Sequence, residues 1–152
     1  MLVVSPHLDD AVLSCGRRLA AHPGGVVVTV FAGTPRDGER LTDWDARCGF
    51  AGAAQAMAAR RDEDRAALAR LRARPVWLDF LDAQYGETPA LEAVREALAH
   101  VLGEARPDTV LYPLGLFHSD HLLAHEASRL ALAAHPRVRA LAYEDVPYRG
   151  VP

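Results

Sequence analysis

Short apolar segments alternate along this chain with longer segments of helical periodicity, and this alternation limits the fold more than any other feature. Five segments are apolar on both faces, as strands buried in a parallel sheet are. They are Leu2–Ser5, Val26–Phe31, Val76–Asp79, Thr109–Pro113 and Arg139–Tyr143. Helices are predicted between them, at about 11–21, 46–73, 91–105 and 121–134. The alternation predicts an α/β fold, a Rossmann-like, doubly wound, mostly parallel sheet with helices on both faces.

The length and composition are those of one globular domain, which we expect to span residues 1–152. Half of the residues are hydrophobic and the net charge is −3. An acidic balance argues against nucleic acid or an anionic membrane as partner, because both select basic surfaces. No apolar run approaches the ~20 residues of a membrane span. The first ten residues do not resemble a signal peptide, and two cysteines make no disulfide framework. We therefore expect a cytoplasmic protein.

Polar clusters follow two of the predicted strands. The first strand leads into Pro6-His7-Leu8-Asp9-Asp10, and the fourth leads through Gly115 into His118-Ser119-Asp120-His121. Each acid could simply cap the helix that follows it. In a doubly wound sheet, however, strands one and four are neighbours across the switch point, and ligands bind beyond the carboxyl ends of strands. The two clusters are therefore expected to face each other across one crevice.

Histidines and a carboxylate arranged in this way are typical of a catalytic metal site. Three such ligands with an open fourth position suit catalytic zinc. The same donor set suits non-haem iron, so the residue types leave Zn²⁺, Fe²⁺ and other divalent metals open. A phosphoesterase with two metal ions is disfavoured, because the clusters offer too few carboxylates. Schiff-base chemistry is excluded, because the chain contains no lysine.

These motifs resemble those of the PIG-L/LmbE-type metal-dependent N-deacetylases. That family combines a P/A-H-P/x-D-D stretch, here Pro6–Asp10, with a later H-x-D-H, here His118–His121. Arg60–Glu63 matches the R-x-x-E helix of the family, and Tyr143–Tyr148 resembles a Y-E-D-x-P-Y stretch. The resemblance spans essentially the whole chain. Family members usually continue with further strands that wall the pocket, so we expect a domain that is short at its C-terminus.

The resemblance implies a role for each matching residue. The metal ligands would be His7, Asp10 and His121. Asp9 would be the general base, His118 the electrophile or acid, and Asp120 a support for its neighbours. The implied reaction is zinc-dependent removal of an N-acetyl or similar N-acyl group from a small amino sugar or glycoconjugate. The alternative is a catalytically impaired Rossmann-like binding module with a residual metal site, but such a module needs neither Asp9 nor His118.

Other polar residues are candidates for contact with substrate. Arg60 is the arginine of R-x-x-E, which can reach the substrate in relatives, and Asp82 and Tyr85 could touch a sugar hydroxyl. Arg61 and Asp64 share a helix face with apolar residues. Because burying an unpaired charge is costly, they predict an ion pair that ties the helix to the sheet.

The last predicted strand, Arg139–Tyr143, is expected at an edge of the sheet. Its apolar residues leave that edge weakly protected, since natural edges are normally covered, bulged or charged. We therefore expect it to pair with a second copy of the chain and form a two-fold symmetric homo-oligomer.

Overall fold

A parallel sheet forms the centre of the protein, whose computed structural model describes residues 1–86 and 88–150. The strands are β1 (Leu2–Ser5), β2 (Val26–Thr29), β3 (Arg74–Trp77), β4 (Thr109–Pro113) and β5 (Arg139–Tyr143). They lie in the order β3-β2-β1-β4-β5, and every neighbouring pair is parallel. The predicted doubly wound sheet, with its first and fourth strands adjacent, is therefore confirmed. All carboxyl ends lie at one edge of it.

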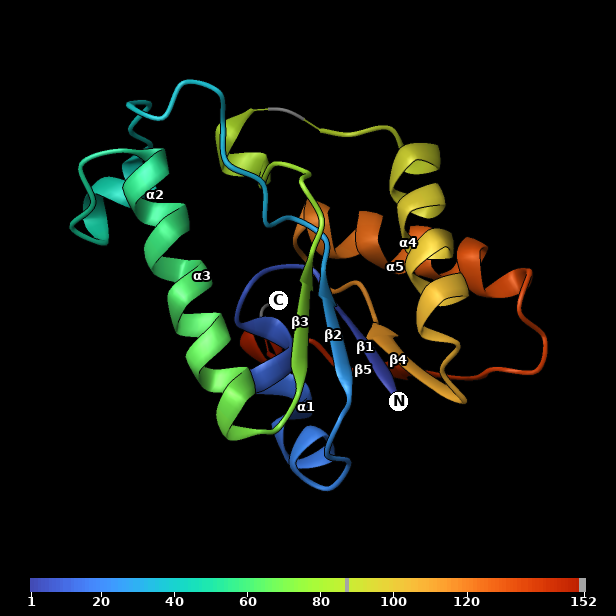
Figure 1. Ribbon diagram of the computed structural model, residues 1–152. Helices are drawn as coiled ribbons and strands as arrows, with labels where there is room; N and C mark the ends of the chain where they lie inside the picture. The colour runs from blue at the N-terminus through green and yellow to red at the C-terminus, as the bar shows by residue number, and fades with distance from the viewer. Residues whose placement is uncertain (87, 151–152) are drawn as a thin grey trace.

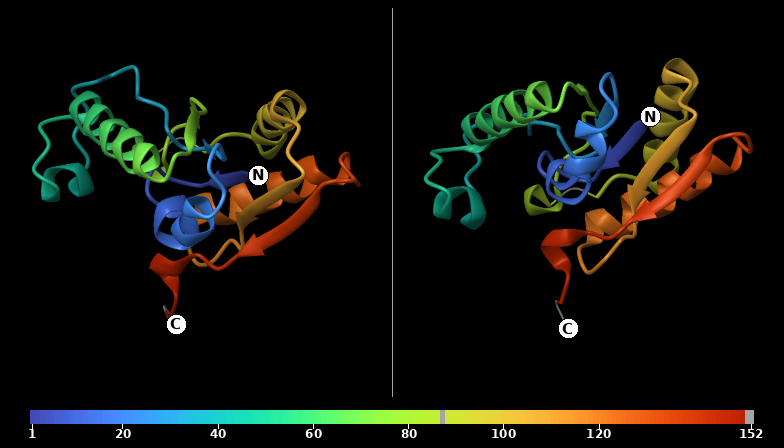
Figure 2. Two further views of the ribbon diagram at one scale, coloured as in Figure 1. Left: turned by 60° about the horizontal axis from the view of Figure 1, so that its bottom comes forward. Right: turned by 90° about the horizontal axis from the view of Figure 1, so that it is seen from below.

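Helices cover both faces of the sheet, as predicted (Figure 1). They are α1 (Asp10–Ala20), α2 (Asp43–Arg47), α3 (Ala53–Arg70), α4 (Leu91–Ala105) and α5 (Ser119–Ala133), with single 3₁₀ turns η1 (Ala83–Tyr85) and η2 (Val146–Tyr148). α1 and α3 pack on one face, and α4 and α5 pack on the other. Figure 2 shows η2 beside α1, at the end of the described chain. No helix in these ranges is long and apolar enough to cross a membrane.

One predicted helix is longer than the observed one, because within 46–73 only α3 at Ala53–Arg70 is a continuous helix, and 46–47 end the short helix α2. The chain leaves α2 after Arg47 and turns at Gly49, whose φ of +84° is a conformation that glycine adopts without strain. It then approaches its own loop so closely at Gly52 that an added Cβ would lie 2.8 Å from the carbonyl oxygen of Gly38. Only then does α3 begin. The break carries α2 away from the sheet.

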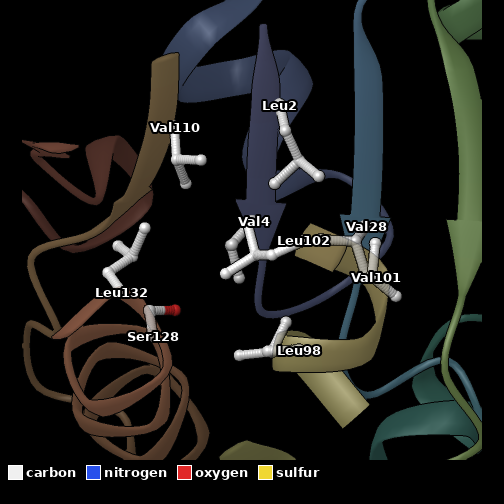
Figure 3. Close-up of a pocket in the computed structure, with 9 residues that line it drawn as sticks. All are labelled: Leu2, Val4, Val28, Leu98, Val101, Leu102, Val110, Ser128 and Leu132. Carbon is white, nitrogen blue, oxygen red and sulfur yellow. The ribbon is translucent and has the colours of Figure 1, made fainter. Parts of the chain in front are cut away.

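The two faces of each central strand supply two separate cores. Val3 and Val27 pack toward Leu19 of α1 and Leu68 of α3. On the opposite face, valines and leucines of β1, β2, β4, α4 and α5 enclose a cavity of about 10 Å³ (Figure 3). Ser128 is its polar residue, and its hydroxyl donates to the carbonyl oxygen of Ala124. A space of about one water with an apolar lining stays dry, so this cavity is a packing gap and not a ligand site.

Candidate active site

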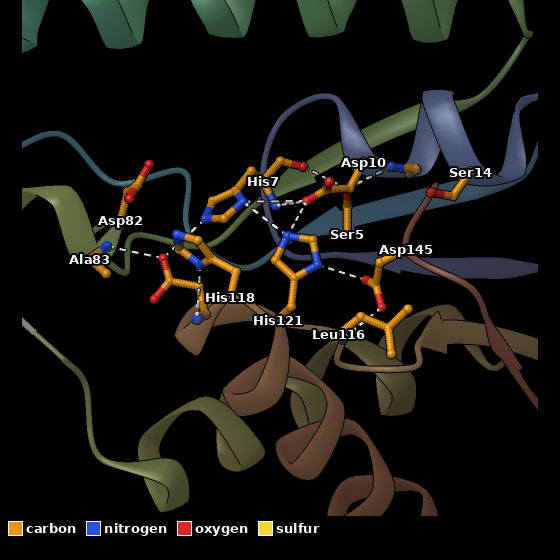
Figure 4. Close-up of polar contacts among 12 residues, drawn as sticks. Ser5, His7, Asp10, Ser14, Asp82, Ala83, Leu116, His118, His121 and Asp145 are labelled. Carbon is orange, nitrogen blue, oxygen red and sulfur yellow. Dashed lines mark hydrogen bonds and ion pairs between the residues drawn. The ribbon is translucent and has the colours of Figure 1, made fainter. Parts of the chain in front are cut away.

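The two polar clusters meet at the carboxyl ends of β1 and β4 (Figure 4). His7 lies in the turn after β1, Asp10 begins α1, and His121 lies in the first turn of α5. The turn after β1 is fixed locally. The hydroxyl of Ser5 donates to the carbonyl oxygen of His7 and accepts from the backbone N–H of Ala11. The backbone N–H of His7 also donates to the carboxylate of Asp10, 2.9 Å away.

Three potential ligand atoms form a nearly regular triangle. Nδ1 of His7 and Oδ2 of Asp10 are 3.4 Å apart, and Oδ2 of Asp10 and Nε2 of His121 are 3.1 Å apart. The two nitrogens are separated by 3.3 Å. A tetrahedral ion with bonds of ~2.0–2.1 Å separates its ligand atoms by about 3.3 Å. The residues present therefore fit a divalent metal ion.

Carboxylates hold the outer nitrogens of both histidines. Nε2 of His7 lies 3.0 Å from Asp120, and Nδ1 of His121 lies 2.6 Å from Asp145. An ionised carboxylate only accepts hydrogen bonds, so these outer nitrogens carry the protons and the lone pairs point into the triangle. Asp120 thus orients His7, and it also accepts from the backbone N–H of Ala83.

His118 could form a second metal-binding group with His7 and Asp120, because their ligand atoms lie within 4.8 Å of one another. The tautomers of His7 and His118 disfavour this second metal-binding group, because the nitrogens that would bind the ion carry protons. Nδ1 of His118 accepts from the backbone N–H of Asp120, which leaves its proton on Nε2, and Nε2 of His7 is protonated as well. Burial and the neighbouring His7 lower the pKa of His118. His118 is therefore a neutral ring that offers an N–H donor.

The electrostatics of the cluster favour a cation within it. Burial alone would lower the pKa of His7, but hydrogen bonds to Asp10 and Asp120 raise it to about 10, so without a metal ion the ring holds a second proton, which a bound cation would replace. Burial would raise the pKa of Asp10, but hydrogen bonds from His121 and His7 hold it below its usual range. For Asp9, partial burial of the carboxyl group and the charge of Asp10 raise the pKa. The two adjacent acids thus differ, with Asp10 ionised inside the triangle and Asp9 outside it.

A pocket of about 870 Å³ opens over the triangle. Its polar part includes His7, Asp9, Asp10, Asp82 and His118. Its apolar part includes Leu13 of α1, Trp44 of α2, Phe50, Met57 of α3 and Pro147 of η2. The pocket therefore places an apolar surface beside the cluster of histidines and carboxylates.

Of the three predicted substrate contacts, two line the pocket and one does not. Arg60 and Asp82 line the pocket. The guanidinium of Arg60 also pairs with Asp45 at 2.7 Å, and Asp82 accepts hydrogen bonds from Gln84. Tyr85 is fully buried, and its hydroxyl donates to Asp45 at 2.9 Å. The predicted contact of Tyr85 with substrate is therefore wrong for this structure, because its hydroxyl is bound to the buried carboxylate of Asp45 in α2.

The predicted ion pair that ties α3 to the sheet is present only as a long contact, 3.9 Å between Arg61 and the exposed carboxylate of Asp79 just beyond β3. Arg61 donates to the carbonyl oxygen of Ala32 and lies over the ring of Trp77, 5.5 Å from its centroid. Asp64 accepts from the indole N–H of Trp77 at 2.8 Å. Both residues tie α3 to the sheet as expected, but through separate partners.

Two residues of the Y-E-D-x-P-Y stretch, Asp145 and Tyr148, lie at the site although the sequence did not mark them as candidates. Asp145, just beyond β5, is completely buried against His121. Tyr148 in η2 lines the pocket, and its ring meets that of His121 edge-on with centroids 4.8 Å apart. An acid at the carboxyl end of the strand beside β4 was the available signal for Asp145. No comparable signal marked Tyr148.

Comparison with known proteins agrees with this geometry. The family model of PIG-L, described as GlcNAc-PI de-N-acetylase, matches residues 2–132. The chain belongs to the PIG-L family. The resemblance read from the motifs is thereby confirmed, and the triangle of His7, Asp10 and His121 lies within the matched residues 2–132 of this chain.

Similar proteins of the PIG-L type include a curated enzyme and several solved structures. The 2'-N-acetylparomamine deacetylase of Streptomyces fradiae is 36% identical, over 98% of this chain and 57% of its own length. The structure of the A40926 pseudoaglycone deacetylase superposes with a TM-score of 0.87 at 34% identity, over 97% of this chain and 64% of that chain. A zinc-inhibited form of teicoplanin deacetylase gives a TM-score of 0.84 at 30% identity, over 97% of this chain and 68% of that one. The chain thus spans little more than half to two thirds of the length of these PIG-L relatives.

Proposed function

We propose that this PIG-L domain is a metal-dependent amide hydrolase that removes an N-acetyl or similar N-acyl group from an amino sugar within a glycoconjugate. One observation carries the proposal. The triangle of His7, Asp10 and His121 has each histidine held by an outer carboxylate, and it lies in a pocket also lined by Asp9 and His118. The similar deacetylases of paromamine and glycopeptide chemistry support the substrate class.

The proposed metal is zinc, held by His7, Asp10 and His121. When bound, a divalent ion would polarise the amide carbonyl and lower the pKa of a water molecule. Two imidazoles and a carboxylate also suit Fe²⁺ and other divalent ions. The zinc-inhibited form of teicoplanin deacetylase makes the amount of zinc a variable to control.

The protein's own groups can carry out the proton transfers of amide hydrolysis. Asp9 lines the pocket outside the triangle with a raised pKa, so it can take a proton from the attacking water and return it to the leaving nitrogen. The neutral ring of His118 can donate a hydrogen bond to the carbonyl oxygen as it gains charge. Asp120 and Asp145 keep the ligating histidines in the required tautomer. Water is consumed, the C–N bond breaks, and a carboxylate and an amine result.

The proposal extends to the surroundings of the enzyme. Cys15 and Cys48 are free thiols, which suits a reducing cytoplasmic location. The net charge of −3 supports a small-molecule partner over nucleic acid or an anionic membrane.

Turnover of a defined panel tests the proposal. The purified chain, loaded with one equivalent of Zn²⁺ or Fe²⁺, would be incubated with N-acetylglucosamine, 2'-N-acetylparomamine and an N-acylated glycopeptide. Mass spectrometry should detect the free amine together with the released acid. Binding of these compounds without any product would favour the impaired binding module instead. Loss of product in the Asp9→Asn variant would show that this chain, and not a contaminant, is the catalyst.

A further inference from the structure

Tyr148 lies against both histidines of the H-S-D-H motif, and the mechanism above gives it no task. Its ring stacks on that of His118 at 6.0 Å between centroids and meets His121 edge-on at 4.8 Å. It also stacks on the ring of Phe117, with 5.9 Å between the centroids. Tyr148 is therefore packed into the wall of the pocket and does not project freely into solvent.

The position of this ring is tied to the metal-binding cluster itself. Asp145 binds His121 with one carboxylate oxygen, and with the other it accepts from the backbone N–H groups of Gly115 and Leu116. The turn η2 starts directly after Asp145, and the backbone N–H of Tyr148 donates to its carbonyl oxygen at 2.9 Å. Asp145 thus holds both His121 and, through the turn η2, Tyr148.

The hydroxyl of Tyr148 differs from those of the buried tyrosines. Tyr85 donates to Asp45, and Tyr143 donates to the carbonyl oxygen of Val4. Within residues 1–86 and 88–150 the Tyr148 hydroxyl has no hydrogen-bond partner, although its side chain lines the pocket. A phenol has an ordinary pKa of ~10, so at neutral pH this group is an O–H donor available to a bound molecule.

We propose that the Tyr148 hydroxyl donates a hydrogen bond to the acyl carbonyl oxygen of the substrate, beside the Nε2–H of His118, and that this bond strengthens as the oxygen becomes an oxyanion. The proposal rests on the proposed function. Two donors on adjacent stacked rings would meet the same oxygen from one side of the pocket, while Asp9 acts from the α1 side. A donor already in place where charge develops acts mainly on the transition state.

The test compares Tyr148→Phe with Tyr112→Phe, each in metal-loaded protein. Both variants lose one phenol hydroxyl, but Tyr112 is on β4 and packs against His125 on the α4–α5 face. Loss of one oxyanion donor costs about 10²–10³-fold in kcat. We expect Y148F to lose about 100-fold in kcat with KM changed less than about threefold, and Y112F to match the wild type. Metal content should be equal in all three proteins.

Calorimetric titration with methylphosphonate adds a readout without turnover, because its tetrahedral oxyanion copies the developing charge. Its Kd should rise about tenfold in Y148F alone, which corresponds to one lost hydrogen bond. If wild type turns over substrate and Y148F retains the kcat of Y112F, the role of Tyr148 is refuted while the proposed function stands. If wild type releases no acid from any compound, the proposed function fails and this inference fails with it.

Discussion

Asp9 and Asp10 are adjacent in the sequence, and the start of α1 separates their roles. Asp10 is the first residue of that helix, is 3% exposed and faces both His7 and His121. Asp9 precedes the helix, is exposed and lines the pocket. A helix turns its side chains by about 100° per residue, so neighbouring acids cannot both face the triangle.

Substitution of each acid should therefore give a different defect. Asp9→Asn should retain the metal and lose about 10²–10⁴-fold in kcat, because general-base catalysis contributes that much. Asp10→Ala should lose metal affinity, because it removes one corner of the triangle. Metal content by mass spectrometry, measured beside kcat, checks both. Equal metal loss in the two variants would overturn the division of roles.

The carboxylate of Asp145 should matter for metal affinity although it lies outside the triangle and contacts only the outer nitrogen of His121. Asp145→Asn replaces a charged acceptor at 2.6 Å from Nδ1 by a neutral amide, which weakens the hold on the ligating tautomer. Such outer partners typically change metal affinity by about 10–100-fold. Chelator competition should show this loss in Asp145→Asn and none in Glu144→Gln, its exposed neighbour. Unchanged affinity in both variants would remove Asp145 from the site.

The site residues that directly follow β1 and β4 could be predicted from the sequence, whereas those whose place depends on other elements could not. His7, Asp10 and His121 could be expected together because parallel strands bring their carboxyl ends to one edge. The task of Asp145 depends on β5 pairing with β4 and on the chain returning over α1 at η2. Tyr85 illustrates the opposite error. A tyrosine beside a pocket suggests a substrate contact, but its direction depends on the buried acid Asp45, far away in sequence.

At the scale of whole elements, β3 is the strand whose range differs most from its prediction. The ranges of β1, β4 and β5 match their predictions, and β2 ends at Thr29, two residues before the predicted Phe31. β3 spans Arg74–Trp77 and begins two residues before the predicted start at Val76. Arg74 and Pro75 argue against a strand in a sheet interior. They are tolerated here because β3 has a neighbour on one side only, so the missing N–H of Pro75 costs no ladder bond there.

The short helix α2 depends on one buried carboxylate for its place. Asp45 is fully buried and accepts from Arg60 of α3 at 2.7 Å and from Tyr85 of η1 at 2.9 Å. Removing one partner of a buried charge pair typically costs about 3–5 kcal/mol. Asp45→Ala should lower the free energy of unfolding in urea by about this amount, since it leaves Arg60 without its carboxylate.

A control on the same helix separates this effect from helix propensity. Asp43 is exposed in the first turn of α2, where a negative charge adds only about 0.3–1 kcal/mol. Asp43→Ala should therefore be nearly as stable as the wild type. Because Trp44 lies on α2 and lines the pocket, Asp45→Ala should also raise KM more than Asp43→Ala does. Equal stability of the two variants would contradict the anchoring role.

For the molecule as a whole, the second edge of the sheet predicts self-association. β5 is an edge strand as expected, and its Ala140 and Ala142 are exposed. Light scattering at micromolar concentration should give a dimer. Ala142→Lys should give a monomer, because a charged edge resists strand pairing. Ala66→Lys, an exposed alanine of α3, adds the same charge away from the edge and should stay dimeric. A monomeric wild type would refute this prediction.

Because all strands run in the same direction, the pocket and the turns suited to engineering lie at opposite edges of the sheet. Every strand ends at the pocket, so the turns that precede β2, β3, β4 and β5 lie at the opposite edge, at 21–25, 71–73, 106–108 and 134–138. Surface turns of this kind are where inserted segments and circular permutation are best tolerated. A reporter peptide placed there, or a tether that immobilises the protein on a support, would leave the mouth of the pocket facing the solution.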